Sequence, residues 1–218
     1  DPLAVASRRD LKRINALMFH AAIMSRLLRR HTATQPSRML DIGGGDGTFM
    51  LAVARRLAKH WSNLELIILD QAEAVACERQ EDFARLGWRM KTVSCDVFEW
   101  IANADEAPFD AVTANLFLHH FSEPDLARLL AALRPLTPVF VAAEPRRAGV
   151  ALAASSMLWA IGANKVTLHD APASVRAGFS GREISALWPV GEGDVLEERR
   201  VGPFTHIFAA AKPEAMRP

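Results

Sequence analysis

A short apolar strand that runs directly into a glycine-rich loop is the feature that most limits what this chain can fold into. Residues 38–42 read Arg-Met-Leu-Asp-Ile, residues 43–47 read Gly-Gly-Gly-Asp-Gly, and apolar side chains then recur at helical spacing over 48–60. Glycines let the backbone turn sharply and approach a ligand closely, and the N-terminus of the next helix offers unpaired N–H groups. The pattern predicts a strand–loop–helix unit that binds a phosphate, a dinucleotide or an adenosyl cofactor.

The residues of this loop narrow the choice of ligand. A dinucleotide fingerprint requires a third glycine at the sixth position counted from Gly43, and this chain has Thr48 there. The chain also lacks the GxxxxGK[ST] pattern of a phosphate-binding P-loop. Asp41 lies two residues before the first glycine, where a carboxylate suits a cationic ligand better than a pyrophosphate.

Strand and helix patterns alternate along most of the chain. The run over 64–70 is almost continuously apolar, which is typical of a strand buried on both faces of a parallel sheet. The other predicted elements are strands at 90–95, 109–114 and 138–144, helices at 72–86 and 125–133, a helical or irregular segment at 148–188, and a hairpin at 195–201 and 205–211. This alternation predicts an α/β fold with a doubly wound parallel sheet.

The composition excludes several classes of protein. The 218 residues are 50% hydrophobic and 23% charged, as in an ordinary single globular domain. Lys and Arg (26) nearly balance Asp and Glu (25), so the chain has no overall field for binding a phosphate backbone. Two cysteines cannot form a disulfide framework or a four-cysteine zinc site, and no convergent ligand spacing predicts a metal. The absence of tyrosine excludes a tyrosine base.

The first 38 residues carry eight basic side chains against two acidic ones. Apolar residues recur at helical spacing from Asp10 to about His31, with Arg and Lys on the opposite face, and a polar linker follows. The charge fits a solvated helix face, or the steering of an anionic substrate or RNA. No secretory signal is apparent, and the longest uncharged stretch, 148–164, is shorter than the roughly 20 apolar residues of a membrane span. We therefore expect a soluble, cytoplasmic protein.

Three segments resemble the signature motifs of the class I S-adenosylmethionine-dependent methyltransferases. LDIGGGDGTF at 40–49 is similar to their first motif, LIILDQ at 66–71 to the second and CDVFEW at 95–100 to the third. The resemblance implies a seven-stranded, mostly parallel, Rossmann-like sheet that ends in an antiparallel C-terminal hairpin. It also implies S-adenosyl-L-methionine as the cofactor and S-adenosyl-L-homocysteine as the product.

The same resemblance implies roles in cofactor binding. Asp41 is expected to help hold the ammonium end of the cofactor, Asp70 the ribose hydroxyls and Asp96 the adenine amine. The glycine backbone is expected to wrap the ribose and methionine parts. The expected cofactor-binding residues are Asp41, Gly43, Gly45, Gly47, Asp70, Gln71, Asp96, Val97 and Asn115.

The segment FDAVTANLFLHHF at 109–121 bears on the acceptor. Asn115 lies where a strand should reach the carboxyl edge of the sheet, the edge at which α/β folds bind ligands. Enzymes that methylate amino groups of DNA or RNA bases carry Asn-Pro-Pro-aromatic in this region. Residues 116–118 are Leu-Phe-Leu instead, which disfavours base methylation.

Two adjacent histidines follow this strand. The stretch is similar to small-molecule O-methyltransferases of the caffeate and hydroxyindole type, whose catalytic histidine falls on His119; that family has Asp at His120 and Trp at Phe121. A neutral imidazole can take the proton of a phenol or hydroxyl as the methyl group arrives. The run is equally similar to quinone-biosynthesis C-methyltransferases, where the pair need not be a base. His119 as base, His120 as base, and a purely structural pair all stay open.

Glu144 closes the predicted strand at 138–144. It is expected either to orient the histidine or a substrate hydroxyl, or to form a surface ion pair with Arg146 or Arg147. The segment that follows, 146–188, is expected to be a helical insertion that covers the acceptor. Its Met, Trp and Phe residues suit a flat apolar acceptor and equally suit a core.

The chain is thus predicted to comprise an N-terminal helical cap (1–37) and an S-adenosylmethionine-binding catalytic domain (38–218). The predicted function is methyl transfer to a hydroxyl of a small aromatic or polyketide acceptor, with a histidine base. The alternatives are C-methylation of a quinol or polyketide carbon, RNA methylation, a nicotinamide-dependent oxidoreductase, and a non-catalytic cofactor-binding protein. The predicted partner is a small-molecule acceptor; nucleic acid is disfavoured, no membrane span is expected, and a homodimer is left open.

Overall fold

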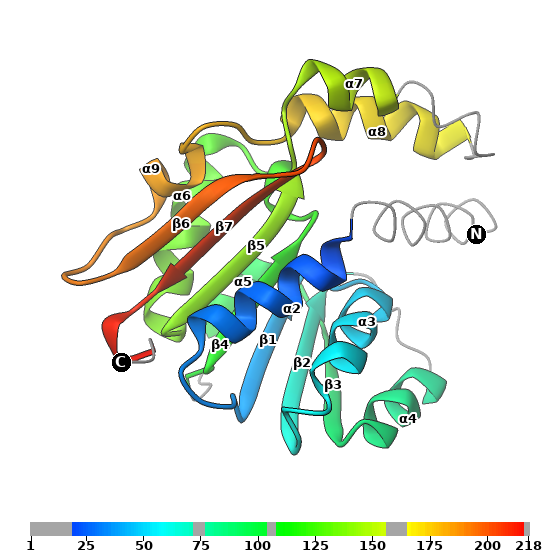
Figure 1. Cartoon of the computed structure of the whole chain (residues 1–218), viewed down its shortest axis with the longest axis vertical. Helices are drawn as coiled ribbons and strands as arrows, with labels where there is room; N and C mark the ends of the chain where they lie inside the picture. The colour runs from blue at the N-terminus through cyan, green and yellow to red at the C-terminus, as the bar shows by residue number, and fades with distance from the viewer. Residues whose placement is uncertain (1–18, 72–76, 104–107, 156–164, 216–218) are drawn as a thin grey trace.

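One sheet organises the chain, seen in a computed structural model that describes residues 19–71, 77–103, 108–155 and 165–215. In the described part its strands follow the order β3-β2-β1-β4-β5-β7-β6 (Figure 1). They are β1 (Arg38–Ile42), β2 (Leu64–Asp70), β3 (Trp88–Ser94), β4 (Ala111–Asn115), β5 (Val139–Pro145), β6 (Val195–Val201) and β7 (Thr205–Ala211). Strands β1 to β5 are parallel to one another, and β7 is antiparallel to both β5 and β6. The predicted fold class is confirmed.

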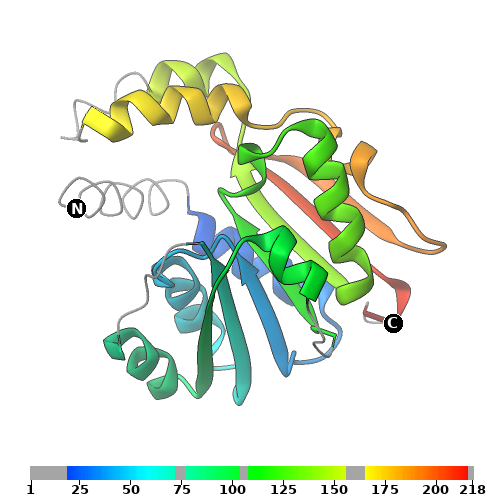
Figure 2. The ribbon, with the colours of Figure 1, turned by 180° about the vertical axis from the view of Figure 1, so that it is seen from behind.

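Helices cover both faces of this sheet. On one face lie α2 (His20–His31), α3 (Thr48–Leu57) and α4 (Cys77–Arg85), and on the other α5 (Val97–Asn103), α6 (Glu123–Leu133) and α9 (Glu183–Leu187) (Figures 1 and 2). The helices α7 (Gly149–Ser155) and α8 (Lys165–Ala177) extend beyond the carboxyl end of β5. Short 3₁₀ turns are η1 (Leu118–His120), η2 (Arg134–Leu136) and η4 (Pro213–Ala215).

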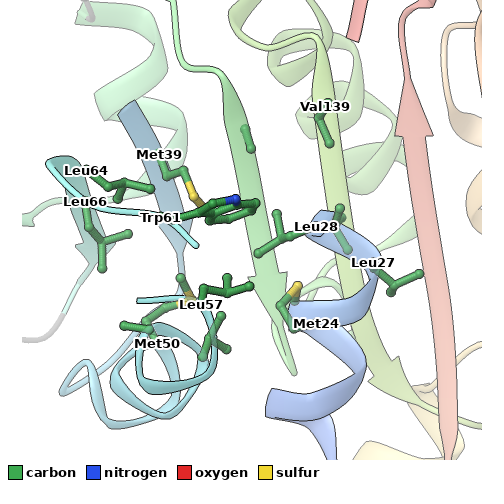
Figure 3. Packing of buried hydrophobic residues seen from close by; sticks show 14 of the residues in the cluster. Met24, Leu27, Leu28, Met39, Met50, Leu57, Trp61, Leu64, Leu66 and Val139 are labelled. Atoms are coloured by element: carbon green, nitrogen blue, oxygen red, sulfur yellow. The ribbon is translucent and has the colours of Figure 1, made fainter. Parts of the chain in front are cut away.

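Two hydrophobic clusters hold these layers together. Side chains alternate across each strand, so Met39 faces α2 and α3, whereas Leu40 faces α6. In the first cluster α2 contributes Met24 and Leu28, which pack near Trp61 at the end of α3 (Figure 3). The second cluster joins the opposite face to α5, α6 and α9. The helix α2 therefore shares a core with the sheet, and the division into a cap and a catalytic domain remains a prediction.

Several predicted boundaries agree with the structure. The predicted strands at 38–42 and 64–70 and both predicted hairpin strands have the observed ends. The ends of the other predicted strands and helices differ from the observed ones by at most three residues, and the predicted start of the helix at 72–86 lies outside the described residues.

Two local expectations differ from the structure. The segment after β3, expected as a loop, is the helix α5, which begins directly after Asp96 because that carboxylate accepts from the Phe98 and Glu99 N–H groups. The predicted helix at 10–31 is confirmed from His20 onward. It is preceded by Phe19 with a left-handed φ of 55°, and residues 10–18 lie outside the described residues.

Packing of α2 against the sheet can be tested with a core truncation. Leu28 is fully buried, so Leu28→Ala removes contacts and leaves a cavity, and we expect it to lower the free energy of unfolding by about 2–5 kcal/mol. Val190→Ala is the matched control because Val190 is largely exposed, and it should change stability by less than about 0.5 kcal/mol. Urea denaturation measures both, and equal small losses would show that α2 does not pack as described.

Candidate active site

The glycine loop begins where β1 ends and turns back across the carboxyl edge of the sheet. Gly43, Gly45 and Gly47 have φ values of 68°, 53° and 71°, a region in which side chains other than glycine are strained. The Gly43 N–H donates to the Leu69 carbonyl at 2.8 Å, and the Gly45 N–H donates to Asp70 Oδ2 at 2.8 Å. The loop is therefore tied to the end of β2, which brings the first two predicted motifs together.

The space around the loop fits a ligand that lies against bare backbone. A Cβ atom on Gly43 would overlap the Phe117 ring, whereas one on Gly45 would meet nothing within 4 Å. The loop is thus closed on the side of η1 and open at Gly45. Asp70 is half-buried beside that opening. A glycine cradle with a carboxylate at its side suits a cofactor that offers hydroxyls and a positive charge.

A second carboxylate lies next to Asp70. Asp96 lies two residues after the end of β3, whose last residue, Ser94, is in register with Asp70. Asp96 Oδ2 accepts from Gln71 Nε2 at 2.7 Å. Partial desolvation opposes ionisation, but the Glu99 and Phe98 N–H groups and the Gln71 amide together hold the pKa of Asp96 below its usual value. Asp70, Gln71 and Asp96 therefore form one polar edge, as expected from the second and third motifs.

Two further expected cofactor-binding residues, Val97 and Asn115, are more buried. Val97, the first residue of α5, lies in the core. Its neighbour Phe98 is half-buried and packs edge-on against Phe121, with ring centroids 5.7 Å apart. Asn115 is the last residue of β4 and is partly buried. Its predicted contact with the cofactor remains a prediction, as does that of Val97.

Asp41 lies beneath the loop. Its side chain is on a residue only 1% exposed, and Thr113 Oγ1 donates to Asp41 Oδ1 at 2.7 Å. A Cβ atom on Gly44 would come within 2.5 Å of Asp41 Oδ2, so the loop backbone covers the carboxyl group. Burial raises the pKa of Asp41 to about 7; the Thr113 bond lowers it and the charge of Asp70 raises it further. The carboxyl group supports the loop from below, and its contact with an ammonium group stays a prediction.

The structure brings two predicted catalytic residues together. His119 Nδ1 lies 2.7 Å from Glu144 Oε2, although the residues are 25 positions apart. Glu144 is fully buried at the end of β5, and its Oε1 accepts from the N–H groups of Phe117 and Leu118 at 2.9 Å each. Because a carboxylate only accepts, His119 donates from Nδ1, and in a neutral ring this contact leaves the lone pair on Nε2.

His120 and Arg147, which flank His119 and Glu144, do not take part in the contact between them. His120 is exposed, and its ring centroid is 4.1 Å from that of His119. Partial burial and the nearby His119 lower the pKa of His120. Arg147, an expected partner of Glu144, pairs with Glu183 instead. The buried Glu144 therefore contacts His119 and lies away from the surface, and its role in orienting the histidine remains a prediction.

The prediction from sequence missed His20. This buried histidine of α2 contacts Asn115 and Thr205, both at the carboxyl edge of the sheet region. The available signal was its spacing, because His20 lies three and four residues before Ile23 and Met24 on the apolar face of the helix. A histidine at such a place is buried and needs two polar partners.

Comparison with known proteins supports the expected family. Residues 39–137 match the family model described as "Methyltransferase domain", and the fold and loop agree with it. This part of the chain is a methyltransferase domain with the fold of the class I S-adenosylmethionine-dependent methyltransferases. Cephaeline 6'-O-methyltransferase CiOMT from Carapichea ipecacuanha is 31% identical over 101 residues, covering 46% of this chain and 25% of that protein. A second enzyme from the same plant, IpeOMT1, is 30% identical over 92 residues, or 42% of this chain and 22% of that protein.

Solved structures agree with this methyltransferase fold. An O-methyltransferase family protein from Burkholderia thailandensis superposes with a TM-score of 0.61 at 17% identity, covering 92% of this chain and 56% of that one. The plantazolicin methyltransferase BpumL, solved with SAH, gives a TM-score of 0.70 at 12% identity, covering 96% and 90%. This methyltransferase chain spans about a quarter of the curated relatives it matches.

The described residues contain neither a candidate metal centre nor a candidate membrane span. No group of three or more His, Cys, Asp or Glu side chains is placed to hold a metal ion within the four described ranges. Of the helices seen there, none is long and apolar enough to cross a membrane.

Burial of Asp41 predicts how stability depends on pH. The unfolded chain ionises this carboxyl group with its ordinary pKa, whereas the folded pKa is about 7, so its contribution to stability falls as the pH rises from about 4 to about 7. Asp41→Asn removes this titration. We expect it to gain up to roughly 4 kcal/mol relative to the original chain between pH 4 and pH 8. Urea denaturation at both pH values measures the difference, and a difference that does not change with pH would contradict the burial of an ionisable Asp41.

Proposed function

We propose that this methyltransferase transfers a methyl group from S-adenosylmethionine to a hydroxyl oxygen of a small, flat acceptor, with His119 as the base. The observation that carries the proposal is the 2.7 Å contact between His119 Nδ1 and the buried Glu144 carboxylate. That contact stands beside the glycine loop, because Phe117 both covers Gly43 and donates its N–H to Glu144. A base is thus held next to the cradle that would hold the cofactor.

Several residues fit the cofactor. The open backbone at Gly45 would hold its methionine and ribose parts, and the Asp70 carboxylate would accept from ribose hydroxyls. Asp96 and Gln71 would stand at the adenine end. When bound, S-adenosylmethionine supplies a methyl group on a positively charged sulfur, which an acceptor oxygen can attack.

His119 and Glu144 would together remove the proton of the acceptor hydroxyl. Glu144 is fixed by two backbone N–H groups and holds His119 with its proton on Nδ1. The acceptor O–H proton can then pass to His119 Nε2 as the new O–CH3 bond forms, and the imidazolium that results is stabilised by the Glu144 carboxylate. The products are the methyl ether, S-adenosylhomocysteine and one proton, which His119 later releases to solvent.

Aromatic rings line this part of the molecule. Phe117 and Phe121 pack edge-on with centroids 5.1 Å apart, and all three rings of the group (Phe98, Phe117 and Phe121) are half-buried. Half-buried rings beside a polar base suit a flat apolar acceptor and help to exclude water. The His119 side chain is only 4% exposed, which also favours reaction in a dry site.

The packing of α8 bears on which part of the chain covers the acceptor. The helix α8 packs against η1, which carries His119, and against β5, which carries Glu144. This packing supports the proposal that 146–188 covers the acceptor. The O-methyltransferases among its relatives support a small-molecule acceptor. A cytoplasmic location and a homodimer remain predictions from the sequence.

Cofactor binding is the first test. Calorimetry should show that the chain binds S-adenosylhomocysteine and not NAD. Gly43→Ala places a Cβ against the Phe117 ring at a φ of 68°, so we expect the affinity for S-adenosylhomocysteine to fall by about tenfold or more. Gly149→Ala is the matched control because its Cβ would meet open space, and it should bind normally. Binding of NAD in place of S-adenosylhomocysteine would overturn the proposal.

The base is tested by kinetics with a panel of phenols. His119→Ala should lower kcat by about 10²–10⁴-fold while leaving the affinity for S-adenosylhomocysteine unchanged. Glu144→Gln should also lower kcat, because a glutamine N–H facing Nδ1 favours the other tautomer of His119. His31→Gln is the control, since His31 pairs with Glu197 at the other end of α2.

The outcomes separate the alternatives. Normal turnover of His119→Ala would rule out the base, and product analysis with a labelled methyl donor would then decide whether the methyl group is on carbon. No turnover of any acceptor by a chain that binds S-adenosylhomocysteine would favour a non-catalytic role.

A further inference from the structure

A buried histidine connects the first described helix to the end of the sheet. His20 is 0% exposed and is the first residue of α2, which starts near the carboxyl ends of β4 and β5 (Figure 1). Its Nδ1 lies 2.7 Å from Asn115 Oδ1, and its Nε2 lies 3.0 Å from Thr205 Oγ1. Both ring nitrogens of His20 are therefore hydrogen-bonded, and the ring connects α2 to β4 and β7.

The chemistry of these partners defines the state of the ring. The Asn115 amide oxygen only accepts, so His20 Nδ1 carries the proton and donates it. Nε2 then accepts from the Thr205 hydroxyl. Burial lowers the pKa of His20 to about 4, whereas Asn115 and the charge of Glu144 raise it. A neutral ring with one donor and one acceptor agrees with both contacts.

Asn115 stands at the point where the chain leaves the sheet to form the candidate site. It is the last residue of β4, and the next residue, Leu116, has a left-handed φ of 53°. The ring of Phe117 then lies over Gly43, and His119 follows in η1. Carboxyl ends of parallel strands are where open α/β sheets bind ligands. A group that holds Asn115 therefore acts on both the cofactor loop and the base segment.

We propose that His20 is a positioning residue that fixes the Asn115 carboxamide and thereby makes α2 part of the cofactor site. This inference rests on the proposed function and on the expectation from the sequence that Asn115 contacts the cofactor. His20 acts through Asn115, and being fully buried it contacts no ligand itself. The helix α2 precedes the matched family region at 39–137, so this element completes the site from outside that region.

Variants that remove one or both hydrogen bonds of His20 can distinguish positioning of Asn115 from simple attachment of α2 to the sheet. Both bonds attach α2 to the sheet, but only the Asn115 bond reaches the site. Thr205→Val removes the Thr205 bond alone. His20→Asn keeps a donor at the place of Nδ1, because the Asn amide nitrogen is at the same branch position, and it loses the acceptor at Nε2. His20→Phe keeps the ring volume and removes both bonds.

Calorimetric titration of the full chain with S-adenosylhomocysteine tests the proposal. We expect His20→Phe to raise Kd by about 5- to 10-fold, since it removes the hydrogen bond that the Asn115 amide oxygen accepts from His20. Thr205→Val and His20→Asn should each change Kd by no more than about twofold relative to the original chain. Asn115→Ala should raise Kd, and adding His20→Phe to it should raise Kd no further, because residues that act through one another are not additive.

Three outcomes would overturn the inference. An unchanged Kd in a folded His20→Phe variant would do so, as would losses that multiply in the double variant. If circular dichroism shows that His20→Phe does not fold, Thr205→Val and His20→Asn still test the inference. Both variants lose the Thr205 bond and keep the Asn115 bond. A larger loss of affinity in His20→Asn than in Thr205→Val would therefore mean that the Asn115 bond does not determine cofactor affinity. Failure of the original chain to bind S-adenosylhomocysteine would instead refute the proposed function itself.

Discussion

The buried carboxylate of Glu144 is the interaction on which the site depends. A fully buried charge is costly unless hydrogen bonds satisfy it, and Glu144 accepts from the Phe117 and Leu118 N–H groups and from His119. These contacts hold the segment after β4 in the one conformation that presents His119. The left-handed Leu116 belongs to the same turn, so the backbone there is defined by the carboxylate and not by its own preference. The position of His119 and the orientation of its ring are consequences of one satisfied buried charge.

A second buried carboxyl group organises the opposite side of the site. Asp41 supports the glycine loop from beneath, as Glu144 supports η1, and both lie near the carboxyl ends of strands, β1 and β5, that flank β4. The two groups differ in their hydrogen bonds: among the described residues the Asp41 carboxyl group accepts from Thr113, and burial raises the pKa of Asp41 to about 7. A poorly satisfied acid under a loop destabilises the free protein and can be stabilised by a nearby positive charge. Stability is thus reduced at the place where a cationic cofactor would act.

Much of this was accessible from the sequence because the relevant signals are local. The apolar run over 64–70 predicted β2 with its ends, and the glycine pattern predicted the loop. The resemblance of the second and third motifs to those of methyltransferases singled out Asp70 and Asp96. Contacts between distant residues were not accessible. The sequence left Glu144 with two sets of partners, and only the fold shows that His119 is the one chosen. His20 was missed since its partners, Asn115 and Thr205, are 95 and 185 residues away.

The tautomer of His119 is the property that most directly expresses this account. Nitrogen-15 NMR of histidine-labelled protein at neutral pH reports which ring nitrogen carries the proton, with His119→Gln used to assign the signal. We predict a protonated Nδ1 and an unprotonated Nε2, the form that the Glu144 contact requires. A His119 ring protonated on Nε2 would contradict the account, because that nitrogen could no longer take a proton from an acceptor.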